Sequence, residues 1–224
     1  MNVENKTESR LVLTADGSHS VWNPAVGQYY HSVLGALQES RRVFIELGLL
    51  AAFERFETVR LLEMGFGTGL NALLTLLEAQ ARQRPVDYTT VEAYPLPLAE
   101  ARQLNFDAVL GTNHVAALHE APWHQPVAVH PQLTLTKYQT RLQDFRTEKP
   151  FNLVYFDAFA PRSQPELWTT DSFRQLALMM QPGGLLTTYC SKSYVQRNLK
   201  AAGFRVEKHP GPARKREVLR AVLE

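Results

Sequence analysis

The chain has 224 residues, 45% of them hydrophobic, and a net charge of +2, which suits one α/β domain with additions. Its N-terminus is polar, no apolar run approaches the roughly 20 residues that a membrane-spanning helix needs, and Cys190 is its one cysteine. We therefore expect a cytoplasmic protein without a membrane segment, a signal peptide or an internal disulfide.

The first segments of the chain form an extension ahead of the main domain. Residues 10–23 alternate apolar and polar side chains around the turn dipeptide Asp16-Gly17, which predicts a β-hairpin. Residues 35–53 carry apolar side chains at helical spacing and predict an amphipathic helix with a break at Gly48. We divide the chain into an N-terminal extension, residues 1–57, and a single globular unit, residues 58–224.

From residue 59 onward, short apolar runs alternate with helical patterns. Seven segments are predicted to contain strands: 59–64, 87–93, 133–138, 152–157, 181–190, 204–209 and 216–223. Of these, 181–190 begins with a turn. The last two are expected to pair antiparallel across a turn at residues 210–212, and residues 106–132 are interpreted as an insertion of loops and short helices. This order predicts a Rossmann-like α/β sandwich with a seven-stranded, mostly parallel sheet.

Three glycines follow the first strand of this unit, where its helix begins. Gly65, Gly67 and Gly69 form a GxGxG pattern, which lets the backbone turn sharply and approach a ligand at the helix N-terminus. Glu92 ends the second strand, 27 residues after Gly65, where a carboxylate can accept both hydroxyls of a ribose. The pair indicates a nucleoside site, although Glu92 as a surface cap or ion-pair partner is the alternative.

A second candidate site follows the fourth strand of the unit. Asp157 ends this strand, and the carboxyl ends of parallel strands face one crevice. A carboxylate there can accept a hydrogen bond from an amine, and Phe159 can stack on a flat base. Asp157 as a cofactor ligand or a loop cap remains open.

Four histidines lie within the insertion, at positions that do not resemble a metal site. The spacings between His114, His119, His124 and His130 are five and six residues, which suit neither one face of a helix nor a zinc pattern. We expect no metal ion.

The end of the chain is cationic. Residues 192–224 carry nine Lys or Arg and three acids, whereas the remaining residues carry 15 basic and 19 acidic side chains. Clustered positive charge indicates a polyanionic partner such as a nucleic acid. A solvated, charged face explains the same pattern equally well.

Several longer segments together resemble one family. GALQESRRVF, EMGFGTGLNALL, FDAFAPRSQPELWTTDSF, MQPGGLLTTYCSKSYVQRNLKAAGF and GPARKREVL occur in this order over nearly the whole chain. In these segments the chain resembles the methyltransferase domain of MnmC, the bacterial tRNA 5-methylaminomethyl-2-thiouridine biosynthesis enzyme. The resemblance implies a class I methyltransferase fold and S-adenosyl-L-methionine as cofactor. It also implies methyl transfer to the amine of 5-aminomethyl-(2-thio)uridine at the wobble position, in the tRNA anticodon loop.

The resemblance also implies roles for individual residues. Asp157 would face the amine as the catalytic residue. The cofactor would be held by the glycine loop, Glu92 and part of an N-terminal motif: Gly65, Phe66, Gly67, Thr68, Gly69, Glu92, Tyr30 and Glu39. Arg41, from the same N-terminal motif that closes over the pocket, would bind the substrate. Lys215 and Arg216 match the family's closing basic motif and would contact the tRNA backbone. We expect Lys192, from the same cationic segment, to contact it as well.

The chain departs from the family pattern at two places. MnmC proteins usually continue into a flavin-dependent oxidase domain, for which the 224 residues leave no room, so we expect a stand-alone methyltransferase. The family often has a Gly-Asp pair after the third strand, where an acid can read the adenine amine. Here Tyr138, Gln139 and Thr140 occupy that region, which leaves the adenine contact unassigned.

Two other functions fit parts of the pattern. An aminopropyltransferase or a small-molecule N-methyltransferase shares the fold, the glycine loop and the acid after the fourth strand. The cationic end of the chain argues against an aminopropyltransferase, because a polycationic substrate would bind best at a pocket with an acidic entrance. A non-catalytic RNA-binding or partner-binding module would not need the glycine loop, Glu92 and Asp157 together.

Overall fold

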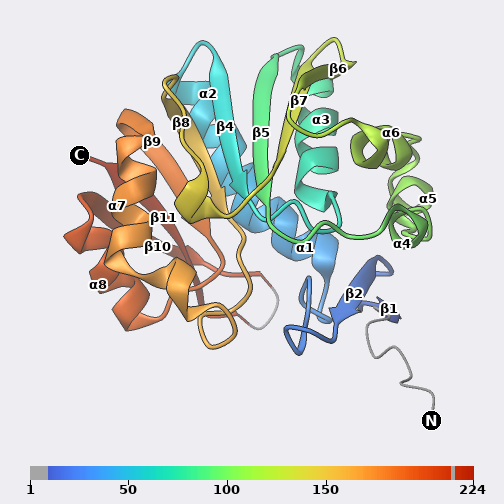
Figure 1. Ribbon diagram of the computed structural model, residues 1–224, viewed down its shortest axis with the longest axis horizontal. Coiled ribbons are helices and arrows are strands. Elements are labelled where there is room, and N and C mark those ends of the chain that lie inside the picture. The colour runs from blue at the N-terminus through green and yellow to red at the C-terminus, as the bar shows by residue number, and fades with distance from the viewer. Residues whose placement is uncertain (1–9, 213–214) are drawn as a thin grey trace.

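The computed structural model describes residues 10–212 and 215–224. Its centre is an eight-stranded sheet with the strand order β10-β11-β9-β8-β4-β5-β7-β6 (Figure 1). The five central strands pair in parallel, and the two C-terminal strands and β6 pair antiparallel. The strands are β4 (Val59–Met64), β5 (Val86–Glu92), β6 (Pro126–His130), β7 (Leu133–Gln139), β8 (Phe151–Phe156), β9 (Met180–Thr188), β10 (Phe204–Pro210) and β11 (Glu217–Leu223).

The predicted Rossmann-like α/β class is confirmed, but the predicted number of seven strands is wrong by one. The eighth strand, β6, lies at the edge of the sheet, inside the segment interpreted as loops and short helices. No residue of β6 is fully buried, and it begins with a proline. Proline is tolerated at a strand's start and on an edge, and an edge strand needs no continuous apolar run. The sequence pattern therefore did not identify it.

Two layers of helices cover the sheet. One face carries a continuous helical run of α1 (Ala36–Ser40), η1 (Arg41–Leu50) and α2 (Ala51–Arg55), together with α3 (Leu70–Arg82). The other carries α7 (Thr170–Leu178) and α8 (Ser193–Ala201). Neighbouring strand residues alternate between two buried clusters, with Leu61 facing α3 and Leu62 facing α7, as the pleat requires. The sheet is thus covered on both faces.

The predicted break at Gly48 is absent. Residues 41–50 form a π-helical segment that continues into α2. A Cβ on Gly48 would lie 3.0 Å from the Tyr155 ring and 3.3 Å from the Thr187 hydroxyl. The missing side chain lets the helix pack closely on β8 and β9, so this glycine serves packing and not a turn.

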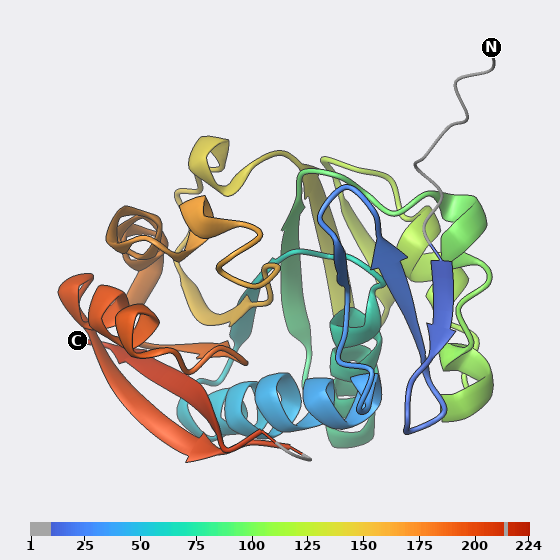
Figure 2. The same ribbon diagram turned by 90° about the horizontal axis from the view of Figure 1, so that it is seen from below.

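A small separate sheet lies at the edge where β4 and β5 end (Figure 1). It consists of β1 (Arg10–Leu13), β2 (His19–Asn23) and β3 (Gln28–Tyr29), and its first two strands confirm the predicted hairpin. Seen from below, it lies beside the short green helices (Figure 2). Asn105 joins the two by accepting from the His19 N–H at 2.8 Å and donating to the Gly17 carbonyl at 2.8 Å.

The remaining elements are short, and they complete the connections between strands. They are α4 (Leu98–Ala101), α5 (Phe106–Leu110), α6 (Val115–Glu120), η2 (Leu142–Asp144) and η3 (Pro165–Trp168). Among the described residues, no helix is both long enough and apolar enough to cross a bilayer. The division of the chain at residue 57 stays a prediction.

Candidate active site

A cavity of about 1300 Å³ opens at the carboxyl ends of β4, β5, β7 and β8. One wall consists of the loops that follow these strands, and the opposite wall is residues 22–32 of the small N-terminal sheet. Single-ligand pockets commonly enclose about 300–1000 Å³. The cavity therefore has room for a nucleoside cofactor and a second ligand.

The glycine loop forms the floor of this cavity between β4 and α3. Gly65, Gly67 and Gly69 all have positive φ angles, of 92°, 49° and 73°. A Cβ on Gly67 would lie 2.8 Å from the Tyr30 ring, so a side chain there would fill the space between the loop and the opposite wall. The Thr68 hydroxyl lies 2.6 Å from His31 Nε2, which ties the loop to the N-terminal sheet.

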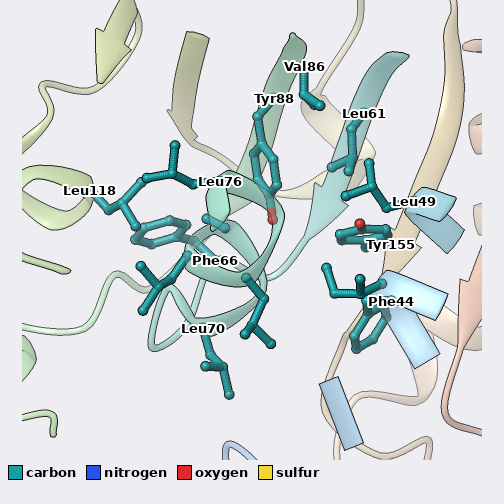
Figure 3. Close-up of a cluster of buried hydrophobic side chains, with 14 of the residues drawn as sticks. Phe44, Leu49, Leu61, Phe66, Leu70, Leu76, Val86, Tyr88, Leu118 and Tyr155 are labelled. Carbon is teal, nitrogen blue, oxygen red and sulfur yellow. The ribbon is translucent and has the colours of Figure 1, made fainter. Parts of the chain in front are cut away.

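One side chain of the loop, Phe66, packs into the core, and His119 of α6 packs against it. Phe66 is buried, and its ring packs beside Leu118 and Leu76 in the hydrophobic cluster (Figure 3). His119 contacts the same ring edge-on at 5.1 Å, and its Nε2 lies 2.9 Å from the Thr68 carbonyl. The loop can therefore offer its backbone to a ligand while these side chains anchor it to the core.

Glu92 lies at the end of β5 and lines the cavity beside the glycine loop. Its carboxylate accepts hydrogen bonds from the backbone N–H groups of Gly67, at 3.1 Å, and Tyr94, at 2.9 Å. Burial raises the pKa of the Glu92 carboxyl, and these backbone donors act in the opposite direction. Each carboxylate oxygen has a second lone pair, so Glu92 can still accept the hydroxyls of a ribose.

Asp157 follows β8 and reaches the cavity from the other side of the glycine loop. Its backbone N–H donates to the Met64 carbonyl at 3.2 Å, and its Oδ2 accepts from Asn71 Nδ2 at 2.8 Å. Burial raises the pKa of the Asp157 carboxyl to about 7, and the Asn71 hydrogen bond opposes this shift. The carboxyl can thus change its protonation state near neutral pH.

Aromatic side chains face each other across the cavity near Asp157. The rings of Tyr30 and Phe159 lie 5.0 Å apart at 59°, and Gln28 Oε1 accepts from the Ala160 N–H at 3.1 Å. Burial and the Glu92 charge raise the pKa of Tyr30 to about 12, so its hydroxyl stays protonated. These contacts join the N-terminal sheet to the loop that carries Asp157.

The basic residues singled out in the sequence lie at different places. Lys215 lines the cavity, where its ammonium forms an ion pair with Glu39 and lies 4.5 Å from the Tyr189 ring centroid. Arg41, Lys192 and Arg216 are exposed and do not line the cavity. We expected Lys215 to be free to contact a tRNA backbone, but it is engaged by Glu39 inside the cavity.

Three cavity residues were not identified from the sequence. Asp144 and Gln143 lie after β7, within six residues of the region left without an adenine-reading acid. Asp144 therefore provides an exposed carboxylate on the expected side of the cavity. Asn71, on the first turn of α3, bonds to Asp157. The one signal in the sequence was a polar residue, Asn71, directly after the glycine loop. Its partner, Asp157, lies 86 residues further along the chain.

The histidines of the insertion do not gather around one point. His119 contacts the glycine loop, and His114 and His130 lie with ring centroids 6.0 Å apart. Within residues 10–212 and 215–224, no group of three or more His, Cys, Asp or Glu side chains has a metal-binding arrangement.

Comparisons with known proteins identify the fold's relatives. A family model described as S-adenosyl-L-methionine-dependent methyltransferase matches residues 123–224. Over 91% of its length the chain is 33% identical to the tRNA 5-methylaminomethyl-2-thiouridine biosynthesis bifunctional protein MnmC of Magnetococcus marinus. It is 31% identical, again over 91% of its length, to the MnmC protein of Delftia acidovorans. The family model therefore places residues 123–224 among the S-adenosyl-L-methionine-dependent methyltransferases.

A solved structure supports the same relationship. The crystal structure of MNMC2 from Aquifex aeolicus aligns with a TM-score of 0.78 and 25% identity, over 100% of this chain and 72% of that one. The chain spans about a third of the length of the MnmC proteins that it matches, 32% and 33%. The predicted enzyme class and cofactor, a methyltransferase that uses S-adenosyl-L-methionine, are confirmed.

The residues of the cavity fit this cofactor. Gly65 and Gly67 present backbone without side chains to the cavity, and Glu92 has lone pairs left for ribose hydroxyls. Asp144 carries an acceptor on the rim for an exocyclic adenine amine. The assignment of individual residues to the cofactor stays a prediction.

Proposed function

We propose that this methyltransferase acts in the cytoplasm on the anticodon loop of tRNA. It converts 5-aminomethyl-(2-thio)uridine at the wobble position to 5-methylaminomethyl-(2-thio)uridine. The names of its MnmC relatives, which state tRNA 5-methylaminomethyl-2-thiouridine biosynthesis, support this substrate. The position of Asp157 in the same cavity as the glycine loop is the observation that carries the proposed chemistry.

Asp157 is suited to bind an amine that must attack while it is uncharged. S-Adenosyl-L-methionine supplies a methyl group on an electrophilic sulfonium when it is bound. A protonated amine has no lone pair, so the enzyme must hold the neutral form in line and exclude water. Asp157 accepts a hydrogen bond from this amine and stabilises the positive charge that develops on nitrogen. Because the pKa of Asp157 is about 7, the carboxylate form prevails above neutral pH.

The walls near Asp157 suit a flat nucleobase. Phe159 and Tyr30 offer ring faces and edges within the cavity, and base–aromatic stacking contributes about 1–3 kcal/mol per base. A wobble nucleotide is unpaired, so turning it out of the anticodon loop disrupts no base pair. The volume of about 1300 Å³ accommodates this base beside the cofactor.

The surface around the cavity carries positive charge that is not engaged within the protein. Several C-terminal cations are neutralised in the β10–β11 hairpin, where Arg220 and Arg205 both pair with Glu207. Lys192 and Arg162 are exposed, near Tyr189 and Ser163 of the cavity, and have no ion pair among the described residues. We assign them to the tRNA backbone, together with Arg216.

The test compares two substrates of different size. Bulk tRNA that carries 5-aminomethyluridine and the free 5-aminomethyl nucleoside are each incubated with enzyme and S-adenosyl-L-methionine, and the nucleosides are identified by mass spectrometry. We expect the mass of one added methyl group on the wobble nucleoside, and a kcat/KM at least about a hundredfold higher for tRNA, since phosphate contacts provide most of the affinity. Preferential methylation of the free nucleoside would instead indicate a small-molecule N-methyltransferase.

A further inference from the structure

A buried carboxyl lies behind Asp157, on the side away from the cavity. Glu63 is the last residue but one of β4, is fully buried, and pairs in register with Thr90 on one neighbouring strand and Tyr155 on the other. Its Oε1 accepts from Asn71 Nδ2 at 3.1 Å. The same Nδ2 donates to Asp157 Oδ2 at 2.8 Å. One amide group therefore bridges two acids from adjacent strands.

The surroundings of Glu63 favour its uncharged form. Burial raises the pKa of the Glu63 carboxyl well above its ordinary value, and the negative charge of Asp157 raises it further. The Tyr88 and Thr90 hydroxyls lie near this carboxyl and oppose the rise of its pKa, but Glu63 Oε2 and both hydroxyls have no hydrogen bond of good geometry among the described residues. A proton on Oε2 gives this polar group a donor, whereas a second buried carboxylate would add unpaired charge.

The neutral Glu63 also fixes the orientation of Asn71. Both amide hydrogens of Asn71 are on Nδ2, and each has its own carboxyl oxygen to bond. Turning the amide over would place Asn71 Oδ1 against the oxygens of Asp157 and lose both hydrogen bonds. Asn71 is 3% exposed, which leaves it little room for another rotamer. The amide thus has one favoured orientation.

This orientation determines which part of Asp157 faces a substrate. With Oδ2 held by Asn71, and the backbone held by the Met64 carbonyl, Oδ1 is the oxygen left to accept a hydrogen bond. A carboxylate with one oxygen fixed offers a defined lone pair, and small errors of alignment at a reacting group are costly. Removal of the amide would free the carboxylate to rotate.

We propose that Asn71 and Glu63 are positioning residues for methyl transfer: the amide of Asn71, oriented by Glu63, holds Oδ2 of Asp157 so that Oδ1 faces the substrate amine. This inference rests on the proposed role of Asp157. The amide also stabilises the ionised form of Asp157, since hydrogen bonding to a carboxylate favours its charged state. Asn71 therefore influences both the direction and the protonation of the same carboxyl.

The experiment replaces each member of the chain and follows Asp157 directly. Asn71→Leu removes the amide at nearly constant size, Glu63→Gln imitates the protonated acid, and Glu63→Leu removes its polar atoms. Thr75→Val is the matched control, since it deletes a buried hydroxyl one turn further along α3. We measure kcat, KM for the cofactor, and the pKa of Asp157 by carbon NMR of aspartate-labelled protein, with its signal assigned by its loss in Asp157→Asn.

We expect Asn71→Leu to raise the pKa of Asp157 by about one unit and to lower kcat at neutral pH at least about tenfold. Part of the kcat loss is recovered at higher pH, where the carboxylate is restored, and KM for the cofactor changes by less than about threefold. Glu63→Leu should also raise the pKa of Asp157 and lower kcat at neutral pH. Glu63→Gln keeps the pKa of Asp157 and remains within about threefold of wild-type kcat.

Two outcomes would overturn the inference. One is an Asn71→Leu protein with the wild-type pKa of Asp157 and wild-type kcat, or with a loss confined to KM for the cofactor. The other, which decides if Asn71→Leu does not fold, is equal activity of Glu63→Gln and Glu63→Leu. The NMR titration needs no substrate, so it tests the hydrogen-bond chain even if wild-type enzyme fails to methylate tRNA, which would refute the proposed function instead.

Discussion

Replacing Asp157 with asparagine tests whether this carboxyl lowers the free energy of unfolding and whether it is necessary for turnover. Burial raises the pKa of the carboxyl from 3.8 to about 7. The folded protein therefore keeps a proton on Asp157 at pH values where the unfolded chain has released it. Asparagine has nearly the same shape, and its Oδ1 can still accept the hydrogen bond that Asn71 donates at 2.8 Å.

The size and sign of the effect follow from this difference. A pKa difference of about three units, at about 1.36 kcal/mol per unit, sets a ceiling of about 4 kcal/mol. Because the folded state binds more protons, the free energy of unfolding falls as the pH rises from about 4 to about 7. The Asp157→Asn protein has no carboxyl at this position, so its free energy of unfolding does not fall for this reason. We expect it to be more stable than wild type by about 2–4 kcal/mol at about pH 8, and equal to it near pH 3.

Urea unfolding at both pH values measures this difference, with Asp144→Asn as the control. Asp144 is an exposed carboxylate on the rim of the same cavity, so its replacement changes the charge equally without removing a buried group. Turnover of Asp157→Asn should fall at least about a hundredfold while cofactor affinity is largely kept. An Asp157→Asn protein that is no more stable than wild type at about pH 8 would refute the reasoning.

Three further predictions concern the walls and rim of the cavity. Gly67→Ala should weaken cofactor binding at least about tenfold by calorimetry, whereas Gly111→Ala, with a similar positive φ and open space around it, should not. Lys192→Ala should flatten the slope of log affinity for tRNA against log salt by about 0.7–0.9, and Arg55→Ala should leave the slope unchanged. Lys215→Met removes a positive charge that lowers the pKa of Asp157, so the rise of kcat with pH should move to higher pH.

The sheet was predictable because its central strands are apolar on both faces. β4 and β8 are buried along nearly their whole length, and such runs stand out between glycine and proline turns. β6 is half exposed and lies on an edge, so it lacked this signal. The π-helical segment 41–50 also went unpredicted. Gly48 was read as a break because its packing against the Tyr155 ring depends on a residue far along the chain.

The candidate site was predictable where function places residues next to strand ends. Glu92 ends a recognisable strand, Gly67 and Asp157 each follow one, and parallel strands bring their carboxyl ends together. The interactions that join distant segments could not be predicted from the sequence. The Asn71–Asp157 hydrogen bond and the Lys215–Glu39 ion pair span 86 and 176 residues, and only the folded chain brings their members together. Glu63, an acid inside an apolar strand, was a signal that sequence reasoning did not use.

A single-turnover experiment tests the central claim, transfer from a cofactor in the glycine loop to an amine held by Asp157. Wild-type enzyme and Asp157→Asn are each loaded with methyl-labelled S-adenosyl-L-methionine and mixed with tRNA that carries 5-aminomethyluridine, and the labelled nucleosides are separated and identified. We predict rapid label on the wobble amine with wild type, and a rate at least about a hundredfold lower with Asp157→Asn at equal cofactor occupancy. Label on any other nucleotide, or equal rates for the two proteins, would contradict the account.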